Sequence, residues 1–180
     1  TIVDTSAPVA PTLTSPSYAK SLPVAISYSG AGDAASGLKA VHLWAKKDTG
    51  AWTDTGLSQT VASGSFSYSS TGAGTYAFAA VAEDKAGNLS AVPSGTGAIT
   101  TVYDDQAPTV GTMTGPQYAK ASPVAISYTS VADTGGSGLK SIQLWVRKDA
   151  GAWATSGLSA TTATGTFSYP VTSGNGHYYF

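Results

Sequence analysis

The chain repeats itself with a period of about one hundred residues, and this period constrains its architecture more than any other feature. Residues 18–28 contain the blocks Tyr-Ala-Lys and Pro-Val-Ala-Ile-Ser-Tyr, and both blocks return at 118–128. The block Phe-Ser-Tyr at 66–68 returns at 167–169, one residue later than the first offset. A fixed period of this length indicates one structural unit that is used more than once.

Both ends of the chain are out of phase with this repeat. Residues 1–4 align with 101–104, where the first copy ends, and residues 176–180 align with 74–78, where the first copy continues. We therefore expect residues 1–4 to be the tail of a preceding repeat, 5–104 to form the first repeat, and 105–180 to form a second, truncated repeat.

Each repeat consists of short runs rich in Val, Ile, Tyr, Phe and Thr, separated by Gly, Pro, Asp and Ser. This spacing is typical of an all-β sandwich with about seven strands per repeat. The runs lie near residues 8–14, 23–29, 38–47, 51–57, 64–69, 74–84 and 96–103. Alternation along them predicts an inward face made of Val24, Ile26, Tyr28, Val41, Leu43, Ala45, Phe66, Tyr68, Tyr76, Phe78, Ala80 and Ala82.

Three segments resemble a known group of domains: Asp33 with residues 36–38, the stretch 76–88, and the linker 104–108. They are similar to the bacterial immunoglobulin-like and fibronectin type III-like tandem repeats of large secreted or cell-surface proteins. The resemblance implies tandem immunoglobulin-like β-sandwiches located outside the cell or on its surface. The chain departs from antibody domains because it has no cysteine.

The composition of the chain limits which classes of partner it can bind. Nine Lys and Arg against ten Asp and Glu leave a net charge of -1, so no basic surplus is available to neutralise the phosphates of a nucleic acid. No apolar run is long enough to span a bilayer, and residue 1 does not begin a signal peptide. We therefore expect neither nucleic-acid binding nor membrane insertion.

Acidic residues gather in loops that a sandwich would bring to the same end. One set is Asp4, Asp33, Asp84 and Asn88, and the matching set at the next junction is Asp104, Asp105 and Asp133. Calcium takes six to eight oxygen ligands, and clustered carboxylates at a domain junction are one way to supply them. The alternative is turn chemistry, in which these side chains bond the backbone of their own loops.

Two tryptophans are out of phase with the inward face of their strand. Alternation turns Trp44 and its repeat equivalent Trp145 toward the outer face. There they could stack on a glycan or contact a neighbouring subunit. Alternatively, residues 77–81 of the adjacent strand leave room for the indole within the same domain, with lysine and arginine stems covering it.

The truncated copy raises the possibility of self-association. A sandwich without its last strands leaves backbone donors and acceptors unpaired beside an open apolar groove. Thr1, Ile2 and Val3 correspond to the end of such a strand and are candidates for donation to another subunit. The alternative is that these residues simply continue a longer polypeptide.

No spacing of His, Asp, Glu or Ser resembles a transition-metal site, a nucleophilic triad or a carboxylate pair for glycoside hydrolysis. We therefore expect a non-catalytic structural or adhesive repeat module of an extracellular surface or filament-forming protein, with itself as a partner in head-to-tail contacts. The alternative function is a carbohydrate-binding accessory module of a secreted enzyme.

Overall fold

The computed structural model describes all residues from 1 to 180, and it is all-β. The chain divides into two compact units: Thr1–Asp105 with Gly135–Ser137, and Gln106–Thr134 with Gly138–Phe180. None of its elements is a helix of the length and apolar character that crossing a membrane requires.

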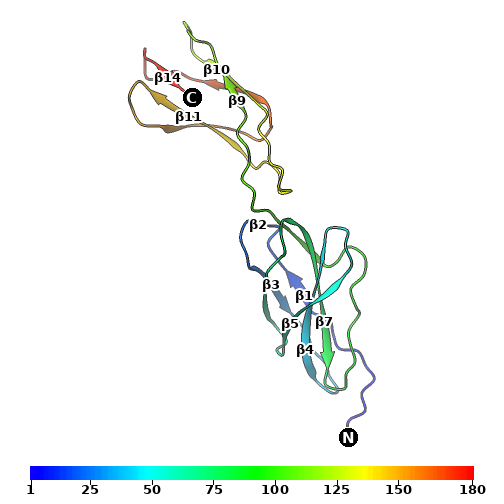
Figure 1. Ribbon diagram of the computed structural model, residues 1–180. Helices are drawn as coiled ribbons and strands as arrows, with labels where there is room; N and C mark the ends of the chain where they lie inside the picture. Colours follow the sequence, from blue (N-terminus) through cyan, green and yellow to red (C-terminus); the bar gives the residue numbers. More distant parts are fainter. The chain divides into compact units, whose positions relative to one another are not determined.

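The first unit is a sandwich of two sheets, and Figure 1 labels most of its strands. The smaller sheet has the order β1-β3-β6, with β1 (Thr12–Thr14), β3 (Val24–Ser29) and β6 (Gly64–Tyr68). The larger sheet has the order β2-β8-β7-β4-β5, with β2 (Tyr18–Ala19), β8 (Ile99–Tyr103), β7 (Gly74–Asp84), β4 (Leu38–Lys47) and β5 (Thr53–Gln59). β2 pairs with β8 in parallel, whereas the other neighbours are antiparallel.

The second unit has two three-stranded sheets. One has the order β13-β10-β9, with β13 (Gly165–Tyr169), β10 (Val124–Thr129) and β9 (Thr112–Thr114). The other has the order β12-β11-β14, with β12 (Ala154–Ala160), β11 (Ile142–Lys148) and β14 (Tyr178–Tyr179). β14 occupies the place next to β11 that the much longer β7 occupies next to β4.

Equivalent strands pair in equivalent register in the two units. Ile26 faces Phe66 between β3 and β6, and Ile126 faces Phe167 between β10 and β13. The β4–β5 pair and the equivalent β11–β12 pair each contain one shift in strand register. The shift falls immediately before Trp44 in the first unit and before Trp145 in the second. The sequence repeat is therefore also a repeat of hydrogen-bonding pattern.

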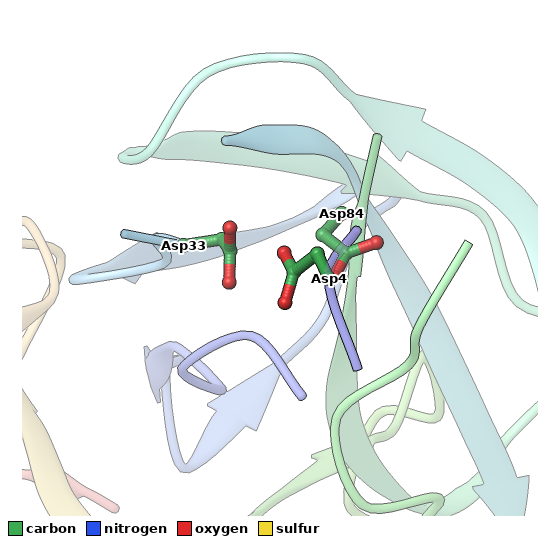
Figure 2. Close-up of side chains that lie close together, drawn as sticks. All are labelled: Asp4, Asp33 and Asp84. Atoms are coloured by element: carbon green, nitrogen blue, oxygen red, sulfur yellow. The ribbon is translucent and has the colours of Figure 1, made fainter. Parts of the chain in front are cut away.

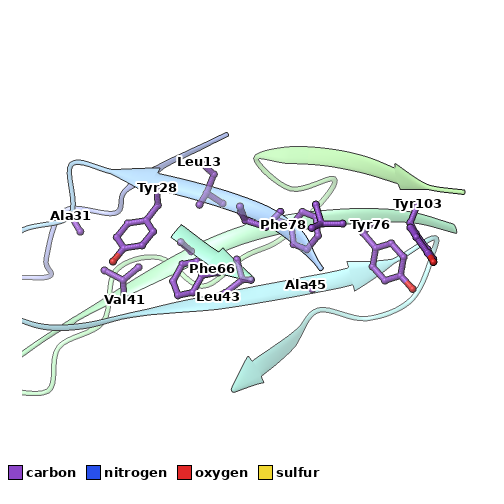
Figure 3. Close-up of a cluster of buried hydrophobic side chains, with 13 residues drawn as sticks. Leu13, Tyr28, Ala31, Val41, Leu43, Ala45, Phe66, Tyr76, Phe78 and Tyr103 are labelled. Atoms are coloured by element: carbon purple, nitrogen blue, oxygen red, sulfur yellow. The ribbon is translucent and has the colours of Figure 1, made fainter. Parts of the chain in front are cut away.

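The core of the first unit lies between its two sheets, and Figure 3 shows its side chains in a row from Ala31 at one end to Tyr103 at the other. The rings of Tyr28 and Phe66 are stacked, with centroids 4.9 Å apart. The Tyr128 and Phe167 rings repeat this contact at the same distance. Burial of such large side chains provides most of the driving force for folding.

The predicted strands at 38–47 and 74–84 are confirmed with those bounds, and the other predicted strands differ by a few residues. β2 was not predicted, because its two residues carry no detectable alternation. The alternation argument also fails in one place. Ala77 and Val81 belong to the predicted outer face of β7 but are only 5% and 2% exposed.

The connection between β7 and β8 explains this burial. The Ser90 N–H donates to the oxygen of Ala82, and the Ala98 N–H donates to the oxygen of Phe78. The Lys46 ammonium and the Trp52 indole N–H both donate to the oxygen of Gly95. The connection is therefore bonded to β7 at both of its ends, and in its middle to Lys46 of β4 and to Trp52 of the β4–β5 turn, so it covers Ala77 and Val81 on the outer face of β7.

Candidate functional site

Three carboxylates converge at one end of the first unit. Asp4 precedes β1, Asp33 follows β3, and Asp84 is the last residue of β7. One carboxylate oxygen of each lies within 4.8 Å of the others. Figure 2 shows the side chain of Asp4 between those of Asp33 and Asp84.

Asp33 organises its own loop. One of its carboxylate oxygens accepts hydrogen bonds from the backbone N–H groups of Ala35, Ser36 and Gly37, at 3.0, 2.8 and 2.8 Å. Gly37 has a φ of 84°, a left-handed conformation that glycine adopts without steric cost. This arrangement is the loop capping that turn chemistry predicted for Asp33.

Asp84 is fully buried and is bonded to Asn88 through both of its oxygens. Oδ1 accepts from the backbone N–H of Asn88 at 2.8 Å, and Oδ2 accepts from the side-chain amide at 2.7 Å. Burial disfavours the charged form, but the hydrogen bonds from Asn88 and from the backbone of Ala86 and Gly87 outweigh it, so the pKa of Asp84 is lowered. Gly87 has a φ of 92°, as expected for a tight turn here.

Asp4 ties the segment that enters the first unit to both loops. Its Oδ2 accepts from the Ser36 N–H at 3.0 Å, and its Oδ1 accepts from the Ser6 N–H at 2.9 Å. Its backbone oxygen accepts from the side-chain amide of Asn88 at 3.0 Å. Hydrogen bonding from Ser36, followed by that from Ser6, lowers the pKa of the Asp4 carboxyl.

We call Asp4, Asp33 and Asp84 the aspartate cluster. Their hydrogen bonds determine whether the cluster can also bind a cation. The carboxylates supply oxygen ligands, but backbone N–H groups already donate to each of them. Asn88 turns its amide nitrogen toward Asp84 and Asp4, and a nitrogen that donates two hydrogen bonds is no cation ligand. The arrangement stabilises two loops and the incoming chain without a metal, and calcium binding stays a prediction.

The matching set is divided between the two units. Asp104 accepts a hydrogen bond from the Ser137 N–H at 3.0 Å, as Asp4 does from Ser36, and both residues belong to the first unit. Asp105 accepts from the Tyr103 hydroxyl at 3.3 Å, whereas Asp133 belongs to the second unit. The position equivalent to Asp84 would lie beyond Phe180, which aligns with Phe78.

The two predicted surface tryptophans differ in exposure. Trp44 is half-buried and pairs across strands with Ala79, in agreement with the predicted cover from β7. Trp145 is 49% exposed. Trp52 and Trp153 were not among the predicted surface residues, although both follow Gly-Ala in the repeat. A Cβ on Gly97 would lie 2.7 Å from the Trp52 ring, so Trp52 packs against the β7–β8 connection, while Trp153 is 46% exposed.

The second unit contains a cavity of about 460 Å³. Its lining includes Pro116, Gln117, Ala119, Gly176 and Tyr178. A second cavity, of about 240 Å³, is lined by core residues such as Met113, Ile142, Leu144 and Phe167. The strand-donation candidates Ile2 and Val3 are 70% and 85% exposed.

Comparison with known proteins adds no relative: no protein-family model matches the chain, and no curated protein matches it significantly in sequence. The functional argument therefore depends on the residues and their geometry.

Proposed function

We propose that the chain is a non-catalytic structural and adhesive repeat module of an extracellular surface or filament-forming protein, built from immunoglobulin-like β-sandwiches. One observation carries this proposal: the repeated sequence folds into strand pairs of the same register, with Ile26 opposite Phe66 and Ile126 opposite Phe167. Repetition of one sandwich adds length without adding new chemistry, which is what a stalk or a filament needs.

The anchoring of the incoming chain supports the same role. Ser36 donates to the carboxylate of Asp4 and Asn88 donates to its backbone oxygen, and Pro8 restricts the backbone that follows. A chain segment held in this way enters the sandwich in one direction. Asp104 and Ser137 repeat the first of these contacts, so the anchoring belongs to the periodic design.

The location is tested by labelling cells of the source organism with an antibody raised against the chain. We expect label on intact cells or on material shed from them. Label that appears only after the cells are permeabilised would contradict an extracellular role.

A carbohydrate-binding accessory module is the second candidate, because the second unit exposes Trp145 and Trp153. The Arg147 guanidinium lies 5.3 Å from the ring centre of Trp153 and 4.4 Å from that of Tyr179, so part of this surface is already occupied by the chain itself. Retention of the chain on immobilised polysaccharides tests this second candidate function. Retention that falls when both tryptophans are replaced by alanine supports a glycan site, and retention that does not change excludes it.

A further inference from the structure

We propose that the shift in register in β5 and in β12 is a blocking device, which keeps the edge strand of one copy from pairing with the edge strand of another. β5 is the last strand of the larger sheet of the first unit, and β12 is the last strand of the equivalent sheet of the second. An edge strand exposes backbone N–H and C=O groups that can pair with a further strand. Repeats of closely similar sequence are especially subject to this risk, because each offers the other a matching edge.

The shift is a large bulge in the edge strand of each unit. Ser58 and Asp54 of β5 pair with residues 42 and 44 of β4, so residues 55–57 lie opposite Leu43 alone. β12 has the same excess at residues 156–158. We call these two segments the edge bulges. A bulge bends its strand and increases the local twist, so an added strand would lose its regular register in the middle of either edge.

The polar groups of the first edge bulge are satisfied within the chain. The Gly56 N–H donates to the Asp54 carboxylate at 2.8 Å. The Leu57 N–H donates to the Thr55 hydroxyl at 3.2 Å. This hydroxyl in turn donates to the Leu43 oxygen of β4 at 2.7 Å, where a regular strand would present a backbone N–H. Two consecutive N–H groups of the edge are therefore unavailable to an added strand.

The second edge bulge repeats these bonds with different side chains. The Gly157 N–H donates to the Thr155 hydroxyl at 3.2 Å, where the first unit uses an aspartate. The Leu158 N–H donates to the Ser156 hydroxyl at 3.2 Å. That hydroxyl donates to the Leu144 oxygen of β11 at 2.7 Å. The two units therefore share the bonding pattern of the bulge although the side chains that make it differ.

A glycine in the left-handed region lies at the centre of each edge bulge. The φ angle is 75° at Gly56 and 78° at Gly157, a conformation that residues with a side chain rarely adopt. A Cβ at either position would meet no atom within 4 Å, so packing does not require glycine there. The requirement is the left-handed backbone, which interrupts the extended strand.

The other common protections of an edge are nearly absent from these two strands. Edge strands also use charged side chains and proline to prevent pairing. β12 contains no charged residue and no proline. β5 contains one charged residue, Asp54, and its carboxylate bonds the edge bulge. The edge bulges are therefore the feature of these strands that guards both edges.

A shortened chain that lacks residues 55–56 and 156–157 tests the proposal. The deletions leave Leu57 opposite Leu43 and Leu158 opposite Leu144, so both edges regain a regular alternation. Sedimentation over a concentration series measures self-association, which should be at least about tenfold stronger than in the unmodified chain.

A lysine on each straightened edge tests whether the edge itself is responsible. Ser58 and Ser159 are exposed, so Ser58→Lys and Ser159→Lys place a charge on each edge of the shortened chain. We expect these substitutions to reverse the gain in self-association, because a charged edge resists pairing. Stronger association that the lysines leave unchanged would place the contact on another surface and would overturn the proposal.

Gly56→Val with Gly157→Val tests the same edges without a deletion. Valine disfavours a positive φ and favours an extended strand, and the open space around both positions accepts its side chain. We expect stronger self-association in this variant too. Gly30→Val with Gly138→Val is the matched control, because these glycines have φ angles of 83° and 76° and equally open surroundings but lie outside the strands.

The outcomes separate cleanly. A shortened chain that unfolds cooperatively in urea, and is therefore folded, but associates no more strongly than the unmodified chain would overturn the proposal. If the shortened chain does not fold, the two valine variants decide the question. Association of Gly56→Val with Gly157→Val that only equals that of the control pair would then overturn it.

Discussion

The hydroxyl of Thr101 donates a hydrogen bond of 2.8 Å to the backbone oxygen of Pro16, and it joins β8 to the segment before β2. Thr101 is 1% exposed, so water does not compete for this bond. The next residue of β8 continues this contact, because the Val102 N–H donates to the Ser17 oxygen at 2.9 Å. Thr101 and Pro16 therefore help to fix β8 at the edge of the larger sheet of the first unit.

Replacing Thr101 with valine keeps the shape of the side chain and removes its hydroxyl. The Pro16 oxygen would then lose its donor in a buried place, and we expect the first unit to lose about 1–2 kcal/mol of unfolding free energy. Urea denaturation measures the loss. The matched control is Thr100→Val, because Thr100 lies on the same strand but is exposed, and it should change stability little.

The first unit should become less stable as the pH falls below 3.8, the ordinary pKa of an aspartate. The pKa values of Asp84 and Asp4 are lowered in the folded chain, so the unfolded chain takes up protons first and acid favours unfolding. The stability is fully present above 3.8 and is lost as the pH falls through the lowered values. Thermal unfolding at pH 7 and pH 3 measures this effect.

The Asp84→Asn variant tests whether the acid sensitivity arises in the aspartate cluster. Asp84→Asn should unfold at a lower temperature at pH 7 and should show a smaller further decrease at pH 3. Asp54→Asn removes an exposed aspartate and should keep the full acid dependence. An unchanged acid dependence in Asp84→Asn would show that other groups are responsible.

Calcium should have little effect on the first unit. Backbone N–H groups donate to the carboxylates of the aspartate cluster, and Asn88 presents its amide nitrogen to them. We expect the same melting temperature with EDTA and with about 5 mM calcium, which exceeds the dissociation constants of many extracellular sites. A rise with calcium that Asp33→Asn abolishes would establish the metal site instead.

Trp52→Ala should loosen the β7–β8 connection. The Trp52 ring packs against Gly97 and its N–H donates to the Gly95 oxygen, so its loss removes both contacts from that segment. Limited proteolysis should cut near residues 92–97 at least about tenfold faster, because cleavage follows local opening. Trp153→Ala replaces the equivalent tryptophan of the second unit, which is 46% exposed, and is the matched control that should leave cleavage at 92–97 unchanged.

Much of the fold could be predicted from the sequence, for a physical reason that β4 illustrates. Val41, Leu43 and Ala45 alternate with less buried residues, because side chains of a strand point to opposite faces in turn. The period of about one hundred residues then transferred the predictions for residues 5–78 to their equivalents up to Phe180. β2 escaped prediction because a two-residue strand has no period to detect.

The site could be predicted only in part. The sequence placed Asp4, Asp33 and Asp84 together, since sandwich topology brings their loops to one end, and the structure confirms that they meet. It could not decide between metal ligation and turn chemistry, because the same residue types serve both. Alternation also could not predict the burial of Ala77 and Val81, because the β7–β8 connection that covers them contains no strand.

Hydrogen exchange of the strand amides tests the central claim, that one sandwich is used twice, most directly. The account predicts that β3 and β10 are protected at equivalent positions, because Ile26 pairs opposite Phe66 and Ile126 pairs opposite Phe167 in the same register. Protection of the amides around Ile26 together with fast exchange around Ile126 would contradict the claim that the second repeat forms the same strand pairs as the first.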